Sequence, residues 1–403
     1  MTLMPHNFDG ISFLVGNESL MLEMVNQRAL KPFDERVIAF LDHFSKRLFR
    51  NPLAKAWPDV ISLAFWCRKS SILQMKKAYP DLSGRMGRGL AFHIAPSNVA
   101  VNFAYSLIAG LLSGNTNIVR VPSRDFPQVS LICDELNATL YEQSIISPYV
   151  CLVRYGREKA VNDMLSAWCQ TRLVWGGDET ITTIRQSPLL PRGLDLAFAN
   201  RYSLALIDAS SYLSIQDKQT IAERFYNDTF LTDQNACTSP KLVIWLGKEE
   251  ETEEARAQFW TEFGVFSQKK YELQAVVAVR KLTQFCTLSA SIEGVKKTSD
   301  SRNLVFRVLL DKLDGKTMNH AGAGGYFLEY LAREIDEIYP VCNNSRCQTL
   351  STLGVDIERI NAFLAECRPE GVDRVVPIGK TMDFGLQWDG YDLIYMLTRC
   401  VVI

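Results

Sequence analysis

The sequence predicts an α/β protein with a doubly wound nucleotide-binding domain, a second α/β domain and a short terminal strand region. Two observations predict it: short apolar runs alternate with segments of helical periodicity, and this alternation resumes after a cysteine-bearing turn. Strands that alternate with helices form a parallel sheet covered on both faces, and such sheets bind nucleotides at the carboxyl ends of their strands. With 403 residues, the chain is long enough for two or three domains.

The elements of the first half follow one another regularly. Residues 35–50 have apolar side chains at helical spacing, which predicts a helix with one buried face. The residues of that face are Val37, Phe40, Leu41, Phe44 and Leu48. Further helices are expected over 59–77, 99–112, 127–140, 158–168 and from 179 onward. Strands are expected over 89–94, 117–121, 150–153 and 172–175.

The second half repeats the pattern around the cysteine-bearing turn. We expect strands over 204–207, 242–245 and 305–310, and helices over 217–230, 249–263 and 268–279. The apolar terminus at 398–403 predicts a last strand. The predicted domains are a nucleotide-binding domain with N-terminal helices (1–208), a cysteine-bearing catalytic domain (209–372) and a C-terminal return segment with an oligomerisation strand (373–403).

Composition and charge narrow the function classes. Hydrophobic residues make up 47% and charged residues 22%, which is ordinary for a soluble globular protein. The net charge of −1 and the lack of long like-charge runs argue against nucleic acid as a partner. No apolar run is long enough to span a bilayer, and we expect a cytoplasmic protein because the N-terminus lacks a secretion signal. Ten cysteines without a CxxC pair and four scattered histidines predict no metal site.

The stretch FLTDQNACTSPKLVIW at 230–245 carries the most informative cysteine. A polar turn places Cys237 just before an apolar run that reads as a buried strand. A thiol in such a turn can be both packed and reachable, as a thiol that forms covalent intermediates must be. The alternative is that Cys237 is one more buried cysteine, because cysteine is among the most buried residue types.

A second polar turn follows the strand predicted at 89–94. It reads Pro96-Ser97-Asn98 where a dinucleotide-binding protein often has a GxGxxG turn, so a nucleotide would be bound more shallowly on the same sheet. Asn98 could donate a hydrogen bond to an oxyanion. Its alternative role is that of an N-cap, because asparagine is a leading capping residue.

The stretch IAPSNVAVNFAYSLIAGLLSGNTNIVRVPS at 94–123 resembles the signature of the aldehyde dehydrogenase superfamily. Within that superfamily, QNACTSP at 234–240, RYSLALI at 201–207 and PIGKTMDFGLQWDGYDLI at 377–394 resemble the LuxC family of acyl-thioester reductases from bacterial bioluminescence. The resemblance covers roughly residues 85–403, with four motifs in the same order and spacing.

The resemblance implies a chemistry for two residues. Cys237 matches the family nucleophile, and Asn98 matches the asparagine that forms an oxyanion hole with the backbone N–H of that cysteine. A thiolate would take the acyl group from an acyl thioester, and this exchange of one thioester for another is close to isoenergetic. Hydride from a nicotinamide would then reduce the enzyme-bound thioester to an aldehyde. A cysteine thiol is mostly protonated at neutral pH, and the sequence shows no obvious cation that would lower its pKa.

The resemblance also implies where the cofactor binds. The residues that match the family's cofactor contacts are Pro96, Arg120, Pro122, Ser123, Gly176 and Gly177. Arg120 stands where the superfamily usually has a lysine, and a guanidinium could hold a 2′-phosphate, which favours NADPH over NADH. The alternatives are a surface arginine closing a strand and an ordinary strand-to-helix turn at the two glycines.

Departures from the superfamily pattern are informative. Hydrolytic members have a water-activating glutamate where this chain reads AFANRYS at 197–203, without a carboxylate. Its absence favours reduction of the acyl group over oxidation to an acid. Glu337 is a candidate for the glutamate that holds the nicotinamide ribose, although a surface acid is the simpler interpretation. His320 and the loop at 322–325 could approach the substrate or be purely structural.

The sequence thus favours an NADPH-dependent reductase that converts an acyl thioester into an aldehyde through a thioester on Cys237. Three alternatives stay open: a CoA-acylating aldehyde dehydrogenase working in the oxidative direction, a non-reducing scaffold or acyl carrier, and a thioesterase or acyltransferase. The resemblance makes an acyl-protein synthetase a candidate partner. The terminal strand leads us to expect a homodimer or homotetramer.

Overall fold

The computed structural model describes residue 8 and residues 10–299 and 302–402. The chain forms two compact units: Met1–Ala199 with Phe384–Ile403, and Asn200–Asp383. These units differ from the boundaries predicted after residues 208 and 372. Strands β8 (Tyr202–Asp208) and β14 (Arg374–Pro377) both pair within the second unit. The second unit therefore begins before β8 and ends after β14.

The first unit is built on a six-stranded sheet in the order β1-β5-β4-β3-β6-β7. Its strands are β1 (Ser12–Val15), β3 (Leu90–Ile94), β4 (Thr116–Arg120), β5 (Val150–Arg154), β6 (Thr171–Trp175) and β7 (Leu194–Phe198). All pairs are parallel except that of β1 with β5. The chain runs outward from β3 through β4 to β5 and then returns to β6 on the other side of β3. The carboxyl end of β3 is therefore the point where the strand order reverses.

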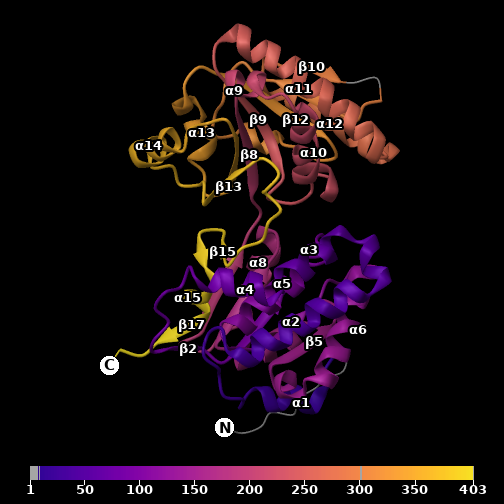
Figure 1. Ribbon diagram of the computed structural model, residues 1–403, viewed down its shortest axis with the longest axis vertical. Coiled ribbons are helices and arrows are strands. Elements are labelled where there is room, and N and C mark those ends of the chain that lie inside the picture. The colour runs from indigo at the N-terminus through magenta and orange to yellow at the C-terminus, as the bar shows by residue number, and fades with distance from the viewer. Residues whose placement is uncertain (1–7, 9, 300–301, 403) are drawn as a thin grey trace. The chain divides into compact units, whose positions relative to one another are not determined.

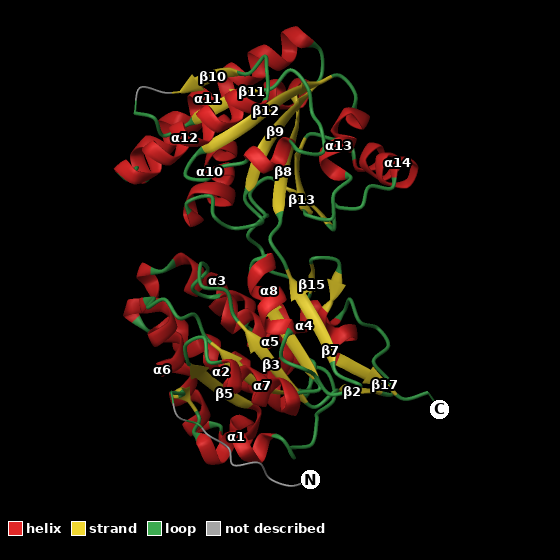
Figure 2. Ribbon diagram, turned by 180° about the vertical axis from the view of Figure 1, so that it is seen from behind, coloured by secondary structure: helices red, strands yellow, loops and turns green. Residues whose placement is uncertain are grey.

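Helices cover both faces of this sheet, as Figure 2 shows. They are α1 (Glu18–Met24), α2 (Glu35–Arg50), α3 (Pro58–Trp66), α4 (Lys69–Lys76), α5 (Asn102–Leu112), α6 (Pro127–Glu142), α7 (Lys159–Trp168) and α8 (Asp178–Arg185). Alternate strand residues point to opposite faces. On β4, Val119 joins the core beneath α2, α5 and α6, whereas Ile118 joins the core beneath α1, α7 and α8. This confirms the predicted doubly wound pattern.

Helix α2 matches its prediction, and the five residues of its predicted buried face are fully buried. The helix predicted over 59–77 is instead two helices. Asp42 on α2 explains the break, because its carboxylate accepts the backbone N–H of Lys69 at 2.9 Å and so caps the first turn of α4. The predicted continuous helix was wrong at residues 67 and 68.

The chain returns to the first unit after Asp383. The returning segment forms the hairpin β15 (Gln387–Trp388) and β16 (Tyr391–Asp392), helix α15 (Leu393–Leu397) and strand β17 (Thr398–Cys400). Strand β17, drawn in yellow in Figure 1, pairs antiparallel with β2 (Arg85–Gly87) of the same chain. The predicted terminal strand therefore has a partner within its own unit.

The second unit is built on a seven-stranded sheet in the order β10-β11-β12-β9-β8-β13-β14. Besides β8 and β14, its strands are β9 (Pro240–Leu246), β10 (Lys296–Ser299), β11 (Phe306–Leu309), β12 (Tyr326–Ala332) and β13 (Cys347–Leu353). All pairs are parallel except that of β10 with β11. The sequence did not predict β12 or β13, although they flank the central strands β8 and β9.

Helices also cover both faces of this second sheet. They are α9 (Ala209–Ser214), α10 (Lys218–Thr229), α11 (Glu249–Lys270), α12 (Ala275–Ser291), α13 (Tyr339–Cys342) and α14 (Ile357–Cys367). Figure 1 shows α14 on one side of the sheet and α10 on the other. The aromatic rings of α10 and α11 fill one core, and Ile360 and Phe363 of α14 fill the other.

The helix predicted over 268–279 was wrong. Helix α11 continues to Lys270, residues 271–274 are not helical, and α12 begins at Ala275. The ring of Tyr271 packs on Phe230 with a centroid separation of 4.3 Å, and its hydroxyl donates to the Asp233 carboxylate at 2.8 Å. These contacts hold the chain out of the helix at Tyr271. Among the described residues, no helix is both long and apolar enough to cross a membrane.

Candidate active site

The cysteine turn connects α10 to β9, and a buried glutamine holds its shape. Asp233 and Gln234 have left-handed backbone angles, with φ of 50° and 56°, so the chain reverses sharply there. The Gln234 amide nitrogen donates to the carbonyl oxygens of Pro240 and Tyr326, at 2.9 and 3.1 Å. Its amide oxygen accepts the N–H groups of Gly325 and Tyr326. Gln234 therefore ties the turn to both β9 and β12.

The glycine loop at 322–325 lies against this turn. Gly324 donates its backbone N–H to the Asp233 carbonyl oxygen at 2.9 Å. Gly325 has a φ of +85°, and a Cβ there would come within 2.2 Å of the Leu304 carbonyl oxygen. The loop thus needs glycine in order to pack against the cysteine turn. Whether it also contacts a substrate stays a prediction.

Cys237 has a partly exposed side chain within this framework. Its sulfur accepts a hydrogen bond from the Gln348 side-chain amide, with 3.4 Å between Sγ and Nε2. Its carbonyl oxygen accepts the Ser203 hydroxyl at 2.7 Å. Ser203 and Gln348 belong to β8 and β13, and the neighbouring strand β9 begins three residues after Cys237. The cysteine therefore lies at the amino end of these strands.

Most of the other cysteines are buried and inaccessible to reagents. Six of the ten are buried, namely Cys67, Cys133, Cys151, Cys169, Cys342 and Cys347. Burial raises the pKa of the Cys133, Cys151 and Cys169 thiols to about 12, so they stay protonated. Cys286 and Cys400 are exposed. Cys237 is thus one of the few thiols within reach of a reagent.

Lys241 is a residue of this site that the sequence analysis missed. It stands four positions after Cys237 near the start of β9, and only 9% of its surface is exposed. Burial lowers the pKa of its amine to about 7, and the charge of Cys237 acts in the opposite direction. The signal was present in the sequence, because lysine is rare at the start of a buried apolar strand.

A further contact joins the cysteine turn to the PIGKTM segment that was part of the resemblance. The Thr238 hydroxyl lies 3.3 Å from the Met382 sulfur and donates to it. The backbone N–H groups of Gly379 and Thr381 donate to the buried Asp228 carboxylate at 2.6 and 3.1 Å. Asp228 lies in α10, so the segment contacts both the cysteine turn and the helix that precedes it.

The predicted cofactor residues lie at one edge of the sheet in the first unit. Strands β4, β3 and β6 are neighbours, and Ile94 lies opposite both Arg120 and Val174. The residues that follow these strands are Pro96 and Asn98 after β3, Pro122 and Ser123 after β4, and Gly176 and Gly177 after β6. All six therefore lie where the strand order reverses, at the place where doubly wound sheets bind ligands.

Asn98 is not the N-cap of the helix that follows. Helix α5 begins at Asn102, four residues later, and its N-cap is Val101. Asn98 lies in an exposed bend instead. The capping alternative is therefore excluded, as is the predicted helix start at 99. The pairing of Asn98 with Cys237 at one oxyanion joins residues of two different units and stays a prediction.

Arg120 is a half-buried residue at the end of β4. Its Nη2 atom donates to the carbonyl oxygens of Gly156, at 2.5 Å, and Tyr155, at 3.4 Å. The guanidinium also lies over the Tyr155 ring, 4.6 Å from its centroid. Arg120 is thus not a loose surface arginine, because these contacts fix its head group. A guanidinium carries further donors on Nε and Nη1.

The two glycines precede α8, and Gly177 is its N-cap. A Cβ at Gly177 would meet nothing within 4 Å, so the backbone there is open to an approaching ligand. As a glycine, Gly177 has no side chain that could cap the first turn of α8. Asp178 and Glu179 in that turn carry charge of the wrong sign for a phosphate. The turn therefore fits a phosphate by its backbone and its open space, not by side-chain charge.

Two further candidates have structural partners. Glu337 accepts the backbone N–H groups of Arg333 and Glu334, at 2.7 and 2.9 Å, and the Tyr330 hydroxyl at 2.7 Å. These contacts favour the structural interpretation of this carboxylate. His320 ends a short 3₁₀ helix, Thr317–His320, and its role as a base stays a prediction.

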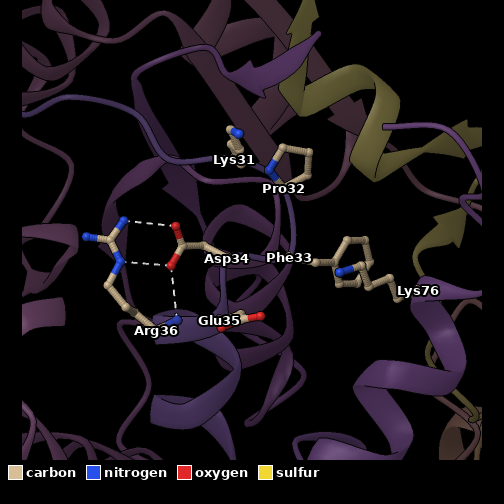
Figure 3. Close-up of a pocket in the computed structure, with 7 residues that line it drawn as sticks. All are labelled: Lys31, Pro32, Phe33, Asp34, Glu35, Arg36 and Lys76. Atoms are coloured by element: carbon tan, nitrogen blue, oxygen red, sulfur yellow. Dashed lines mark hydrogen bonds and ion pairs between the residues drawn. The ribbon is translucent and has the colours of Figure 1, made fainter. Parts of the chain in front are cut away.

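Two surface hollows are lined by residues other than those of this site. Within the described ranges, no group of three or more His, Cys, Asp or Glu side chains could hold a metal ion. A surface hollow of about 420 Å³ lies at the start of α2 (Figure 3). There Asp34 caps the helix and forms a two-pronged ion pair with Arg36, with both distances 2.8 Å. Another hollow, of about 660 Å³, lies against the acidic start of α11.

The fold of this chain is that of the aldehyde dehydrogenases. The structure resembles methylmalonate-semialdehyde dehydrogenase from Oceanimonas doudoroffii with a TM-score of 0.65. The match covers 94% of this chain and 88% of that one at 11% sequence identity. At so low an identity the likeness shows the fold alone, and it confirms the predicted fold class.

The chain belongs to the acyl-CoA reductase (LuxC) family, whose sequence model matches residues 28–402. This confirms the predicted resemblance.

Two curated relatives share a name. The long-chain acyl-protein thioester reductase of Aliivibrio fischeri is 24% identical over 162 residues, which are 40% of this chain and 32% of that protein. The enzyme of the same name from Vibrio harveyi is 20% identical over 302 residues, 74% of this chain and 60% of that protein. This chain thus spans about a third and three fifths of the two relatives.

Proposed function

We propose that this chain is an NADPH-dependent reductase that converts an acyl thioester into an aldehyde through a thioester on Cys237. The observation that carries the proposal is the state of this cysteine. Its thiol is partly exposed, and its sulfur accepts a hydrogen bond from a buried amide. Membership of the acyl-CoA reductase (LuxC) family supports the reaction class.

In the proposed reaction the Cys237 thiolate attacks the acyl carbonyl carbon, and the donor thiol leaves. The oxyanion that forms needs preorganised donors, and we assign this role to the Asn98 side chain and the Cys237 backbone N–H. The strand connection at 197–203 contains no carboxylate that could activate water against the thioester. In this proposal the acyl group therefore stays on Cys237 as a thioester until a hydride reduces it.

A bound nicotinamide dinucleotide would supply the hydride. We propose that it is held at the carboxyl edge of the first sheet. There Gly176 and Gly177 would let a pyrophosphate approach the backbone of α8. Arg120 supplies positive charge on the same edge, with Pro96, Pro122 and Ser123 lining it. A fixed guanidinium suits a 2′-phosphate, which favours NADPH over NADH.

The names of the curated relatives suggest a protein-bound acyl donor. We propose that a long-chain acyl group arrives either on CoA or on an acyl-protein synthetase. We also propose a homodimer or homotetramer as the working form. The second proposal rests on Val401 and Val402, which follow β17 with exposed fractions of 39% and 93%.

The test is turnover of a long-chain acyl-CoA with NADPH, followed by the absorbance of the reduced nicotinamide and by detection of the aldehyde. We expect Cys237→Ala to lower the rate by at least about 10³-fold, because the covalent route is lost. Cys286→Ala, at an exposed cysteine of the same unit, serves as the control and should keep the wild-type rate. Full turnover by Cys237→Ala would refute the proposal.

The same assay separates the alternatives. Acylation of Cys237 without nicotinamide oxidation would favour an acyl carrier or acyltransferase. With NADH in place of NADPH we expect slower turnover. Arg120→Ala should reduce the NADPH preference by about tenfold, the typical weight of one charge-assisted hydrogen bond. An unchanged preference would remove Arg120 from the cofactor site.

A further inference from the structure

Strand β8 has a β-bulge against each of its two neighbours, and both bulges lie at Ser203. On one side, Ser203 lies opposite Pro240 and Leu204 lies opposite Leu242. β9 therefore has one extra residue, Lys241. On the other side, Tyr202 lies opposite Cys347 and Ser203 lies opposite Thr349. The extra residue of β13 is Gln348.

Bulges are rare between parallel strands and re-aim a side chain where they occur, often beside active sites. Here both extra residues have polar side chains in the interior, with exposed fractions of 9% for Lys241 and 2% for Gln348. Between them, the Ser203 hydroxyl holds the Cys237 carbonyl oxygen. The two bulges therefore place both polar side chains beside Ser203, and one of them, Gln348, contacts the cysteine sulfur.

Gln348 is oriented as a donor to the sulfur. Its Nε2 atom lies 3.4 Å from the Cys237 Sγ, and its Oε1 atom accepts the Thr349 hydroxyl at 3.4 Å. An amide nitrogen donates and cannot accept, so this contact stabilises a thiolate more than a thiol.

Lys241 acts on the same sulfur through its charge. Among the described residues, Cys237 is the ionisable group whose charge raises the pKa of this amine, while burial lowers it to about 7. Because the coupling is mutual, a charged Lys241 favours the thiolate. Lys241 stands four residues after the cysteine and is buried at the bulge opposite Ser203, whose hydroxyl donates to the Cys237 carbonyl oxygen.

The other charged groups of this region have partners of their own. Arg201, at the start of β8, pairs with Asp373 and donates to the Cys347 carbonyl oxygen at 2.8 Å. Asp233 in the cysteine turn accepts the Tyr271 hydroxyl at 2.8 Å. The Asp228 carboxylate accepts two backbone N–H groups of the PIGKTM segment. Lys241 thus acts among charges that are already engaged.

We propose that Gln348 and Lys241 stabilise the thiolate of Cys237, Gln348 as a hydrogen-bond donor to the sulfur and Lys241 as a neighbouring cation. Ionisation moves only the thiol proton, from Sγ to water, and changes no other bond. Gln348 touches the reacting atom and is a catalytic residue, whereas Lys241 is a positioning residue. The inference rests on the proposed function of Cys237 as the nucleophile. Lys241 would be the cation that the sequence analysis did not identify.

The test is the rate of iodoacetamide alkylation of each cysteine against pH, measured by peptide mass spectrometry on the full chain. Alkylation reports the thiolate fraction and needs neither acyl donor nor nucleotide. The exposed Cys286 and Cys400 are reference thiols in the same sample. The variants are Lys241→Met, Lys241→Arg and Gln348→Glu. Lys248→Met and Gln216→Glu, at exposed positions of the same unit, are the matched controls.

We expect the wild-type Cys237 midpoint to lie at least about one pH unit below those of the reference thiols. Lys241→Met and Gln348→Glu should each raise it by about one unit, which lowers the alkylation rate at neutral pH by about tenfold. Lys241→Arg should keep most of the shift, and the two controls all of it. A purely structural role would leave the midpoints unchanged.

The proposal is overturned if the wild-type Cys237 midpoint equals those of Cys286 and Cys400. That outcome is measured on the wild-type protein alone and does not depend on the folding of any variant. An unchanged midpoint in Lys241→Met or in Gln348→Glu overturns the role of that residue. Alkylation of the buried Cys342 and Cys347, which lie in the same unit as the variants, would reveal a variant that has not folded. The wild-type comparison then decides. Loss of turnover in Cys237→Ala tests the proposed function separately.

Discussion

Asp228 is a carboxylate in an unusual environment beside the cysteine turn. Both of its oxygens accept backbone N–H groups, from Gly379 and Thr381, and its side chain is fully buried. Burial raises its pKa to about 6, even though the hydrogen bonds act in the opposite direction. Met382 follows Thr381 in the chain, and its sulfur accepts the Thr238 hydroxyl. The protonation state of Asp228 can therefore affect the turn that carries Cys237.

The raised pKa predicts how stability changes with pH. Between about pH 4 and 6 the folded chain holds a proton on Asp228 that the unfolded chain has lost. The stabilisation is therefore present at low pH and is lost as the pH rises through 6, by up to about 3 kcal/mol for two pKa units. Asp228→Asn cannot titrate and should lack this component. The measurement is the free energy of unfolding in urea at several pH values for both proteins.

The comparison rests on the difference between the two pH profiles, because Asp228→Asn also loses one acceptor at every pH. Asp311→Asn, at an exposed position of the same unit, is the control and should follow the wild type. Parallel profiles for wild type and Asp228→Asn would show that the carboxyl group titrates at its ordinary pKa.

At the residue scale, the sequence pointed to Cys237 as the candidate nucleophile but not to the side chains around it. Cys237 stood out because a polar turn preceded an apolar strand. Gln348 lies 111 residues away along the chain and reaches the sulfur only through the pairing of β8 with β13. Lys241 was visible in the sequence, but its burial at a bulge depends on the register of β9 against β8.

At the scale of elements, β12 and β13 went unpredicted for a physical reason. In β12 the apolar run is interrupted by Glu329, which is fully buried. Its carboxylate accepts the indole N–H groups of Trp245 and Trp260 at 3.1 and 2.6 Å, and Arg256 pairs with it at 3.1 Å. In β13 most side chains are polar. Periodicity cannot show a strand whose polar groups are satisfied by distant partners.

The contact between the glycine loop and the cysteine turn is also a property of elements. We expect Gly325→Ala to destabilise the chain by roughly 2 to 4 kcal/mol, because a Cβ would collide with the Leu304 carbonyl and the Phe230 ring at a positive φ. Gly315→Ala is the matched control, since a Cβ there meets nothing within 4 Å. Urea unfolding of both variants measures the difference.

The same pair of variants tests whether the loop holds Gln234. The Gly325 N–H donates to the Gln234 amide oxygen, so displacement of the loop should loosen the turn. Peptide-resolved alkylation of Cys237 should therefore change in Gly325→Ala and stay at the wild-type rate in Gly315→Ala. Equal stability of the two variants would mean that the loop adapts to a side chain without cost.

At the scale of the whole molecule, the two units carry different parts of the proposed chemistry. The first unit gathers its candidate cofactor residues where the strand order of its sheet reverses. The second unit holds Cys237 at the amino end of its own sheet. From alternation alone, the sequence predicted a doubly wound first domain and a second α/β domain. It could not predict the boundary at 199, because the pairing of β8 across the second sheet is non-local.

The central claim is that Cys237 carries the acyl group and that the nicotinamide reduces it. The most direct measurement is a single turnover of the full chain with a long-chain acyl-CoA, followed by mass spectrometry. Without nucleotide, we expect an acyl adduct on the Cys237 peptide and none in Cys237→Ala. Addition of NADPH should then discharge the adduct as one equivalent of aldehyde. An adduct on another residue, or its release as a free acid, would refute the proposed thioester route through Cys237.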